Sequence, residues 1–135
     1  MESVMSKYAL VGLSVAVVLI LSPVATLAAE IRVIDGDSFV TEDDVTVRVD
    51  NIDTPSTGAS AQCFAEREMG TKTVDRVKSL LAECPPVLDK RYTDGRGRTV
   101  ARVEVCGDDL GEILMKEGLA TPRDVPPIWC STGAQ

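Results

Sequence analysis

The sequence predicts one small domain of the α+β class, built mainly from β-strands. Its 135 residues suit a single domain. Residues 45–50 and 100–105 alternate apolar and polar side chains, and this period of two is typical of half-buried strands. Residues 62–82 have a helical composition. Together these observations predict a domain in which strands outnumber two or three packed helices.

The first 28 residues are predicted to be a signal peptide. Residues 8–29 are almost wholly apolar, and Thr26 and Ala28 place small side chains where a signal peptidase cuts. The domain then comprises residues 29–135 and is secreted or periplasmic. The alternative is a membrane anchor that is kept, because an apolar run of about 20 residues can also span a bilayer.

Three strands are expected at the start of the domain. Residues 30–40 hold two short apolar runs on either side of the acidic turn 35–37. Residues 45–50 follow, with valines on one face and Arg48 on the opposite face. The strand therefore presents Arg48 away from the valines.

Two helices are expected later in the chain. Gly70 lies inside the first, residues 62–82, and costs about 1 kcal/mol relative to alanine, so we expect an irregular helix there. The second opens at Asp109 and Glu112, which have the spacing of a capping box, and ends at Gly118, a residue suited to a left-handed conformation. The apolar stripe expected on the first helix comprises Ala65, Met69, Val77, Leu80 and Leu81.

An antiparallel hairpin is predicted between the helices. Residues 86–91 and 99–105 have strand character, and the segment 93–97 between them is rich in turn residues. A Pro-rich tail follows the second helix from Pro122 onward. The expected order is therefore three strands, a helix, two strands and a helix.

The four cysteines are expected to form two disulfides. An exported chain with an even cysteine count and no CxxC pair favours structural disulfides over a zinc or redox site. Paired positions in a hairpin have a constant sum, and 84 and 106 sum to 190, centred on Gly95. We therefore expect Cys84 to pair with Cys106, and by elimination Cys63 to pair with Cys130.

The charged residues limit the chemistry available to the chain. There is no histidine, which excludes Ser-His-Asp and Cys-His nucleophile pairs and Cys2His2 zinc sites. The formal charge is −7, from 14 Lys and Arg against 21 Asp and Glu, which argues against a broad basic surface for nucleic acid. Catalysis must therefore use carboxylates, arginine, lysine, tyrosine, hydroxyl groups or a metal bound by oxygen.

Four short motifs occur in order along the chain: VIDGDS (33–38), RVDNIDTP (48–55), DGRGR (94–98) and GDDLGEILMKEGLA (107–120). Together they resemble the staphylococcal nuclease (thermonuclease) family over residues 31–120. The resemblance implies a five-stranded oligonucleotide/oligosaccharide-binding (OB-fold) barrel with helices packed on it.

This resemblance assigns roles to specific residues. Asp37 and Asp53 correspond to the carboxylates that hold a calcium ion, with the carbonyl of Thr54 as a further ligand. Arg48 and Arg98 correspond to the arginines that bind the scissile phosphate and stabilise the charge of the transition state. The metal would polarise the phosphoryl group and orient the attacking water.

The chain departs from the family pattern at one catalytic position. Ser56 stands where the family has the glutamate usually assigned as general base, and serine has no useful basicity at neutral pH. A general base contributes about 10² to 10⁴ in rate. Glu66, at the start of the predicted helix, is the candidate substitute. The chain also has few aromatic residues for base stacking.

The sequence therefore predicts an exported, calcium-dependent nuclease that hydrolyses DNA or RNA with low sequence specificity, slowed by Ser56. We expect a monomer whose contact with nucleic acid is weak, metal-dependent and sensitive to salt. The alternative is a catalytically degenerate domain of the cell envelope that binds nucleic acid or protein; the acidity, Ser56 and the missing aromatic residues favour it.

Overall fold

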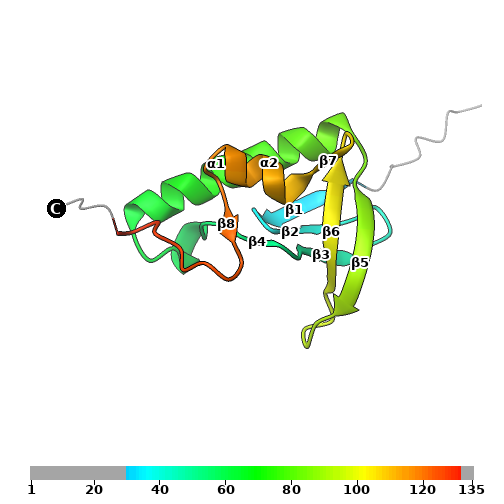
Figure 1. Cartoon of the computed structure of the whole chain (residues 1–135), viewed down its shortest axis with the longest axis horizontal. Coiled ribbons are helices and arrows are strands. Elements are labelled where there is room, and N and C mark those ends of the chain that lie inside the picture. Colours follow the sequence, from blue (N-terminus) through cyan, green and yellow to red (C-terminus); the bar gives the residue numbers. More distant parts are fainter. Residues whose placement is uncertain (1–29, 132–135) are drawn as a thin grey trace, which may run out of the picture.

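The computed structural model describes residues 30–131, so the predicted signal peptide at 1–28 lies outside the described residues. Within them the fold is a mixed α+β arrangement of mainly strands with two α-helices, as predicted (Figure 1). The strands are β1 Arg32–Asp35, β2 Ser38–Val40, β3 Thr46–Val49, β4 Ile52–Asp53, β5 Val87–Thr93, β6 Thr99–Val105, β7 Asp108–Asp109 and β8 Thr121–Pro122; the helices are α1 Phe64–Glu83 and α2 Leu110–Lys116, with a 3₁₀ turn at Gly58–Ser60.

The main sheet has the strand order β1-β2-β3-β6-β5, with β7 paired to β6. Strands β3 and β6 are parallel, whereas the other pairs are antiparallel, and β4 and β8 form a separate two-stranded sheet. Strand β1 has four residues and pairs only with β2 among residues 30–131. The sheet is therefore open there, and the expected closure into a five-stranded barrel is not confirmed.

The predicted hairpin is present, but its register differs from the expected one. Val87 pairs with Glu104, a sum of 191, and Thr93 pairs with Thr99, a sum of 192. A bulge in β5 separates the two parts of the ladder. The expected constant sum of 190 is wrong because the turn is centred on Arg96 and not on Gly95, which gives the sum of 192 beside the turn. The bulge then adds a residue to β5 and lowers the sum to 191 beyond it.

Both expected cysteine pairs lie at disulfide distance. The Cα atoms are 5.4 Å apart in Cys84–Cys106 and 6.0 Å apart in Cys63–Cys130. Cys106 lies beyond the end of β6 with a φ of 54°, so it has left the extended conformation of the ladder. This turn out of the strand lets Cys106 meet Cys84 although the ladder register is not the predicted one.

Helix α1 is continuous through Gly70, so the expected irregularity is wrong. A Cβ atom at Gly70 would lie 2.4 Å from the backbone oxygen of Ser56. Glycine is therefore needed because another chain segment passes against the helix. The buried face is also shifted from the expected stripe, since Ala65 is exposed. The buried residues of α1 are Glu66, Gly70, Thr73, Val77, Leu80 and Leu81.

Helix α2 has the predicted ends. Asp109 accepts a hydrogen bond from the backbone N–H of Glu112 at 2.9 Å. At the other end Gly118 has a φ of 72°, and the N–H of Leu119 returns to the carbonyl of Leu114 at 2.8 Å. These contacts satisfy backbone groups that a helix terminus otherwise leaves unpaired.

The core lies between the main sheet and the helices (Figure 1). Strand β3 contributes Val47 and Val49 to the core and leaves Arg48 between them at the surface side, as predicted. Arg48 therefore lies on a strand that is fixed by the burial of the residues on either side of it, Val47 and Val49. The fully buried apolar side chains include Phe39, Val47, Val49, Ile52, Val77, Leu110 and Leu114.

Candidate functional site

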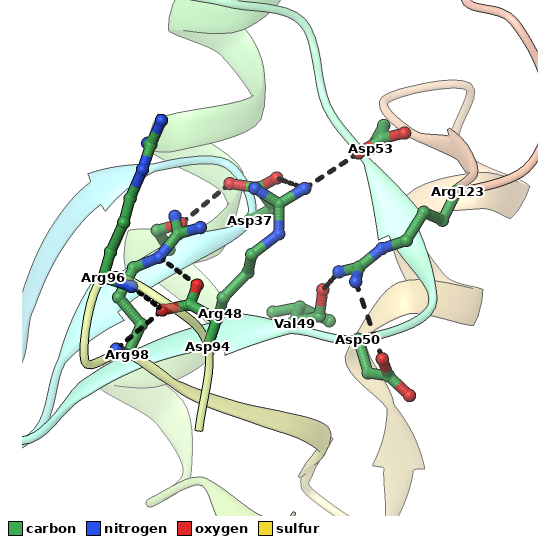
Figure 2. Close-up of polar contacts among 10 residues, drawn as sticks. Asp37, Arg48, Val49, Asp50, Asp53, Asp94, Arg96, Arg98 and Arg123 are labelled. Carbon is green, nitrogen blue, oxygen red and sulfur yellow. Dashed lines mark hydrogen bonds and ion pairs between the residues drawn. The ribbon is translucent and has the colours of Figure 1, made fainter. Parts of the chain in front are cut away.

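The central contact of the site is Arg48 with two aspartates. Its Nη2 atom lies 3.0 Å from Oδ1 of Asp53 and 3.4 Å from Oδ2 of Asp37 (Figure 2). Asp37 lies in the turn between β1 and β2, Arg48 in β3, and Asp53 in β4. The fold thus brings together three of the residues that the sequence motifs single out.

Backbone pairing explains why Asp37 and Arg48 meet. Ser38 pairs with Arg48 across β2 and β3, which places Asp37 beside the end of β3. The N–H of Val49 donates to the carbonyl oxygen of Asp37 at 2.8 Å. The hydroxyl of Ser38 donates to Asp37 Oδ1 at 2.9 Å, and Asp37 is only 8% exposed. The Asp37 carboxylate is therefore held in position before any ligand arrives.

The oxygen atoms around Arg48 are of the kind that a hard divalent cation takes as ligands. Carboxylate oxygens from Asp37 and Asp53 already converge on one cationic atom, and Thr54 follows Asp53 directly. A Cβ atom at Gly36 would lie 2.8 Å from Thr54 Oγ1, so glycine allows Thr54 to approach the acidic turn. Carboxylate and carbonyl oxygens are the ligands that calcium prefers.

Asp35 is a third carboxylate near this cluster, and the sequence motifs alone do not assign it to the site. Burial and the neighbouring charge of Asp37 raise the pKa of Asp35, while the N–H of Gly36 and the charge of Arg48 oppose that rise. The sequence could have pointed to Asp35 as a site residue, because Asp35 belongs to the same VIDGDS motif as Asp37. The structure adds that negative charge is concentrated at this turn.

Arg98 lies at the hairpin turn and is oriented by Asp94. Asp94 Oδ1 accepts from the backbone N–H groups of Arg96 and Arg98, at 2.9 and 3.0 Å, and Oδ2 accepts from Arg98 Nε at 2.8 Å (Figure 2). The Arg98 N–H is the main reason that the pKa of Asp94 lies below its usual value. Within residues 30–131 the terminal amino groups of Arg98 donate no hydrogen bond, since the side-chain bond to Asp94 comes from Nε.

Strand pairing brings Arg98 close to the strand that carries Arg48. Arg48 pairs with Val100 in the parallel ladder of β3 and β6, and Arg98 directly precedes the first residue of β6. Figure 2 draws both side chains in the region of Asp37. Two guanidinium groups near carboxylates match the chemistry of phosphate binding beside a cation.

Ser56 and Glu66 are also brought together. Glu66 Oε1 accepts from the N–H of Ser56 at 3.1 Å, and Oε2 accepts from the N–H of Gln62 at 2.7 Å. Burial alone would raise the pKa of Glu66, but these N–H groups and the Ser56 hydroxyl hold it below its ordinary value. The contacts make Glu66 an anchor for the chain between Ser56 and Gln62.

A comparison with protein families identifies one match. A family model described as staphylococcal nuclease homologue matches residues 46–127, more than half of the chain. The matched segment includes Arg48, Asp53 and Arg98, whereas Asp37 precedes it. No curated protein matches the chain. Separately, no helix within the described part of the chain is long and apolar enough to cross a membrane.

Proposed function

The chain belongs to the staphylococcal nuclease homologue family, and from this membership we propose that it is an exported, calcium-dependent nuclease of DNA or RNA with low sequence specificity. The family supports a nuclease-like or nucleic-acid-binding domain. One observation carries the catalytic part of the proposal: Asp37 and Asp53 converge on Nη2 of Arg48.

The residues present divide into two groups by their chemistry. Asp37, Asp53 and the carbonyl of Thr54 would hold the calcium ion, which supplies a Lewis acid that polarises the phosphoryl group. Arg48 and Arg98 would bind oxygens of the scissile phosphate, because a planar guanidinium can donate two parallel hydrogen bonds. The same hydrogen bonds stabilise negative charge that develops on the phosphoryl oxygens during attack.

Arg48 would change partners when substrate binds. Its Nη2 atom contacts the carboxylates of Asp37 and Asp53, the two side chains that would hold the cation. A phosphate offers this guanidinium a new anionic partner, so Arg48 can leave the carboxylates without losing charge compensation. Arg98 needs no such exchange, since Asp94 contacts its Nε and backbone N–H.

Ser56 limits the expected rate. A serine hydroxyl is a poor proton acceptor, and the loss of a positioned general base costs about 10² to 10⁴ in rate. Glu66 contacts Ser56 and is the candidate substitute, but both of its oxygens accept backbone N–H groups and its pKa is lowered. We therefore propose slow turnover, with Glu66 a weak base at best.

Cleavage of single-stranded DNA and RNA, in calcium or in chelator, tests the proposal. Wild-type protein should cleave slowly in calcium only, Ser56→Glu should cleave about 10² to 10⁴ times faster, and Arg48→Ala should lose activity. Arg91→Ala is the matched control, because Arg91 is an exposed arginine of β5 that pairs with exposed Asp89. If neither wild type nor Ser56→Glu cleaves in calcium, the nuclease proposal is wrong.

The same experiment addresses the second candidate function, a catalytically degenerate domain of the envelope that binds nucleic acid or protein. Ser56 and the engaged oxygens of Glu66 favour it. A silent wild type with activity restored by Ser56→Glu would indicate this degenerate site.

Export is the remaining part of the proposal. The two disulfides support an oxidising location, secreted or periplasmic. N-terminal sequencing of the protein recovered from its host separates a cleaved signal from a kept anchor. Light scattering of the purified domain tests the proposed monomer.

A further inference from the structure

A short corner of the chain joins two residues of the candidate site. Residues 49–51 connect Arg48, in β3, to β4, which carries Asp53. The position of this corner therefore decides whether the Arg48 guanidinium and the Asp53 carboxylate converge. Their contact at 3.0 Å leaves little tolerance for a shift of either strand.

The corner is held by Arg123 from the tail that follows β8. The Nη2 atom of Arg123 donates to the carbonyl oxygen of Val49 at 2.7 Å, and Nη1 lies 3.6 Å from Oδ1 of Asp50 (Figure 2). The backbone N–H of Arg123 donates to the carbonyl oxygen of Asn51 at 3.2 Å. One residue of the tail thus contacts every residue of the corner.

Val49 transmits this contact to Asp37. Its N–H donates to the carbonyl oxygen of Asp37, while its carbonyl oxygen accepts from Arg123. Arg123 and Asp37 therefore bind the same residue through its two backbone polar groups. A displacement of Val49 would move Asp37 and Arg48 together.

A second connection reaches Asp53. Strand β8 pairs with β4, with Thr121 opposite Asp53, and Arg123 follows Thr121 by two residues. Residues 121–123 therefore contact both Val49, the neighbour of Arg48, and Asp53. A charge-assisted hydrogen bond to a partly buried carbonyl is stronger than a neutral one, which suits a positioning role.

From these contacts we propose that Arg123 is a positioning residue, which holds the corner 49–51 so that Arg48, Asp37 and Asp53 converge. It touches neither substrate nor metal in this proposal. The inference rests on the proposed function, because calcium affinity is its principal readout.

Isothermal titration with calcium tests the inference, using wild type, Arg123→Ala, Arg123→Lys and Arg76→Ala. Arg76 is the matched control, since its guanidinium pairs with Glu117 at 2.7 Å between α1 and the end of α2, away from the corner. Loss of a residue that orients metal ligands weakens metal binding by about 10- to 100-fold. We expect that loss for Arg123→Ala, a smaller loss for Arg123→Lys, and a change under about twofold for Arg76→Ala.

Equal calcium affinity in wild type and Arg123→Ala would overturn the inference. A lower thermal stability of Arg123→Ala, without weaker calcium binding, would not support it. Nuclear magnetic resonance separates this failure from failure of the proposed function. If wild type binds no calcium and cleaves nothing, the proposed function is wrong. The inference about Arg123 is then tested by the resonances of the Arg48 Nε–H and the Asp53 backbone N–H. These should shift in Arg123→Ala and not in Arg76→Ala; unchanged signals would overturn it.

Discussion

The Nη2 atom of Arg48 donates a 3.0 Å hydrogen bond to Oδ1 of Asp53. A residue proposed to bind phosphate is therefore held by a residue proposed to bind calcium. Asp37 contacts the same nitrogen at 3.4 Å, so one guanidinium compensates two carboxylates. Removal of Arg48 should therefore lower substrate turnover without weakening the binding of calcium.

Arg48→Ala should lower cleavage by about 10² to 10³, the usual effect of removing one hydrogen-bond donor to a developing anion. Calcium affinity should stay equal to wild type or become tighter, because a competing cation has been removed from Asp37 and Asp53. Cleavage kinetics and calorimetry with calcium measure the two effects. Arg98→Ala is the control, since Arg98 pairs with Asp94; it should lose cleavage with unchanged calcium affinity. Tenfold weaker calcium binding by Arg48→Ala would contradict the competition between guanidinium and cation.

Glu66→Gln should lower the free energy of unfolding at neutral pH by about 1 to 3 kcal/mol, because the amide NH2 group of glutamine would face one of the two backbone N–H donors and cannot accept its hydrogen bond. The pKa of Glu66 is lowered in the folded protein, so its charged form stabilises the fold above the ordinary glutamate pKa. That stabilisation is lost as the pH falls through the lowered pKa.

Thermal unfolding between neutral and acidic pH checks this prediction. The difference between wild type and Glu66→Gln should narrow below about pH 4. Glu68→Gln is the control, because Glu68 is exposed and pairs only loosely with Lys72 at 3.9 Å. A difference that stays constant down to low pH would show that the charge of Glu66 is not the cause.

Gly70→Ala should destabilise the protein by about 1 to 3 kcal/mol, although alanine normally favours a helix. The added Cβ would lie 2.4 Å from the backbone oxygen of Ser56 and must displace that segment. Cleavage should fall as well, because Ser56 lies three residues after Asp53. Gly95→Ala is the control, since a Cβ atom at Gly95 would meet nothing within 4 Å. Chemical denaturation would reject the prediction if Gly70→Ala were as stable as wild type.

Replacing each disulfide by two serines should cost about 2 to 4 kcal/mol, with the larger loss for the longer loop. The sequence separation is 67 residues for Cys63–Cys130 and 22 for Cys84–Cys106. Cys63 also caps α1, where its Sγ accepts from the Glu66 N–H at 3.4 Å, and serine preserves that cap. Denaturant unfolding of the two double variants should therefore rank the Cys63–Cys130 variant as less stable; the reverse order would exclude a loop-length origin.

Local features of this protein can be predicted from the order of its amino acids alone. The alternating valines identify the strand that carries Arg48, and Asp109 and Gly118 identify the ends of α2. The turn residues around Gly95 identify the hairpin, and with it both cysteine pairs. Each of these follows from the conformational preferences of neighbouring residues, which a single sequence displays directly.

Contacts between distant residues become visible only in the folded chain. The approach of Ser56 to Gly70, the engagement of Glu66 by Ser56 and Gln62, and the hydrogen bond from Arg123 to Val49 leave no periodic signal. The bulge that shifts the hairpin register is equally invisible in the alternation. These features depend on packing between segments far apart in the chain, where a contact is set by the relative position of whole elements and not by local conformational preference.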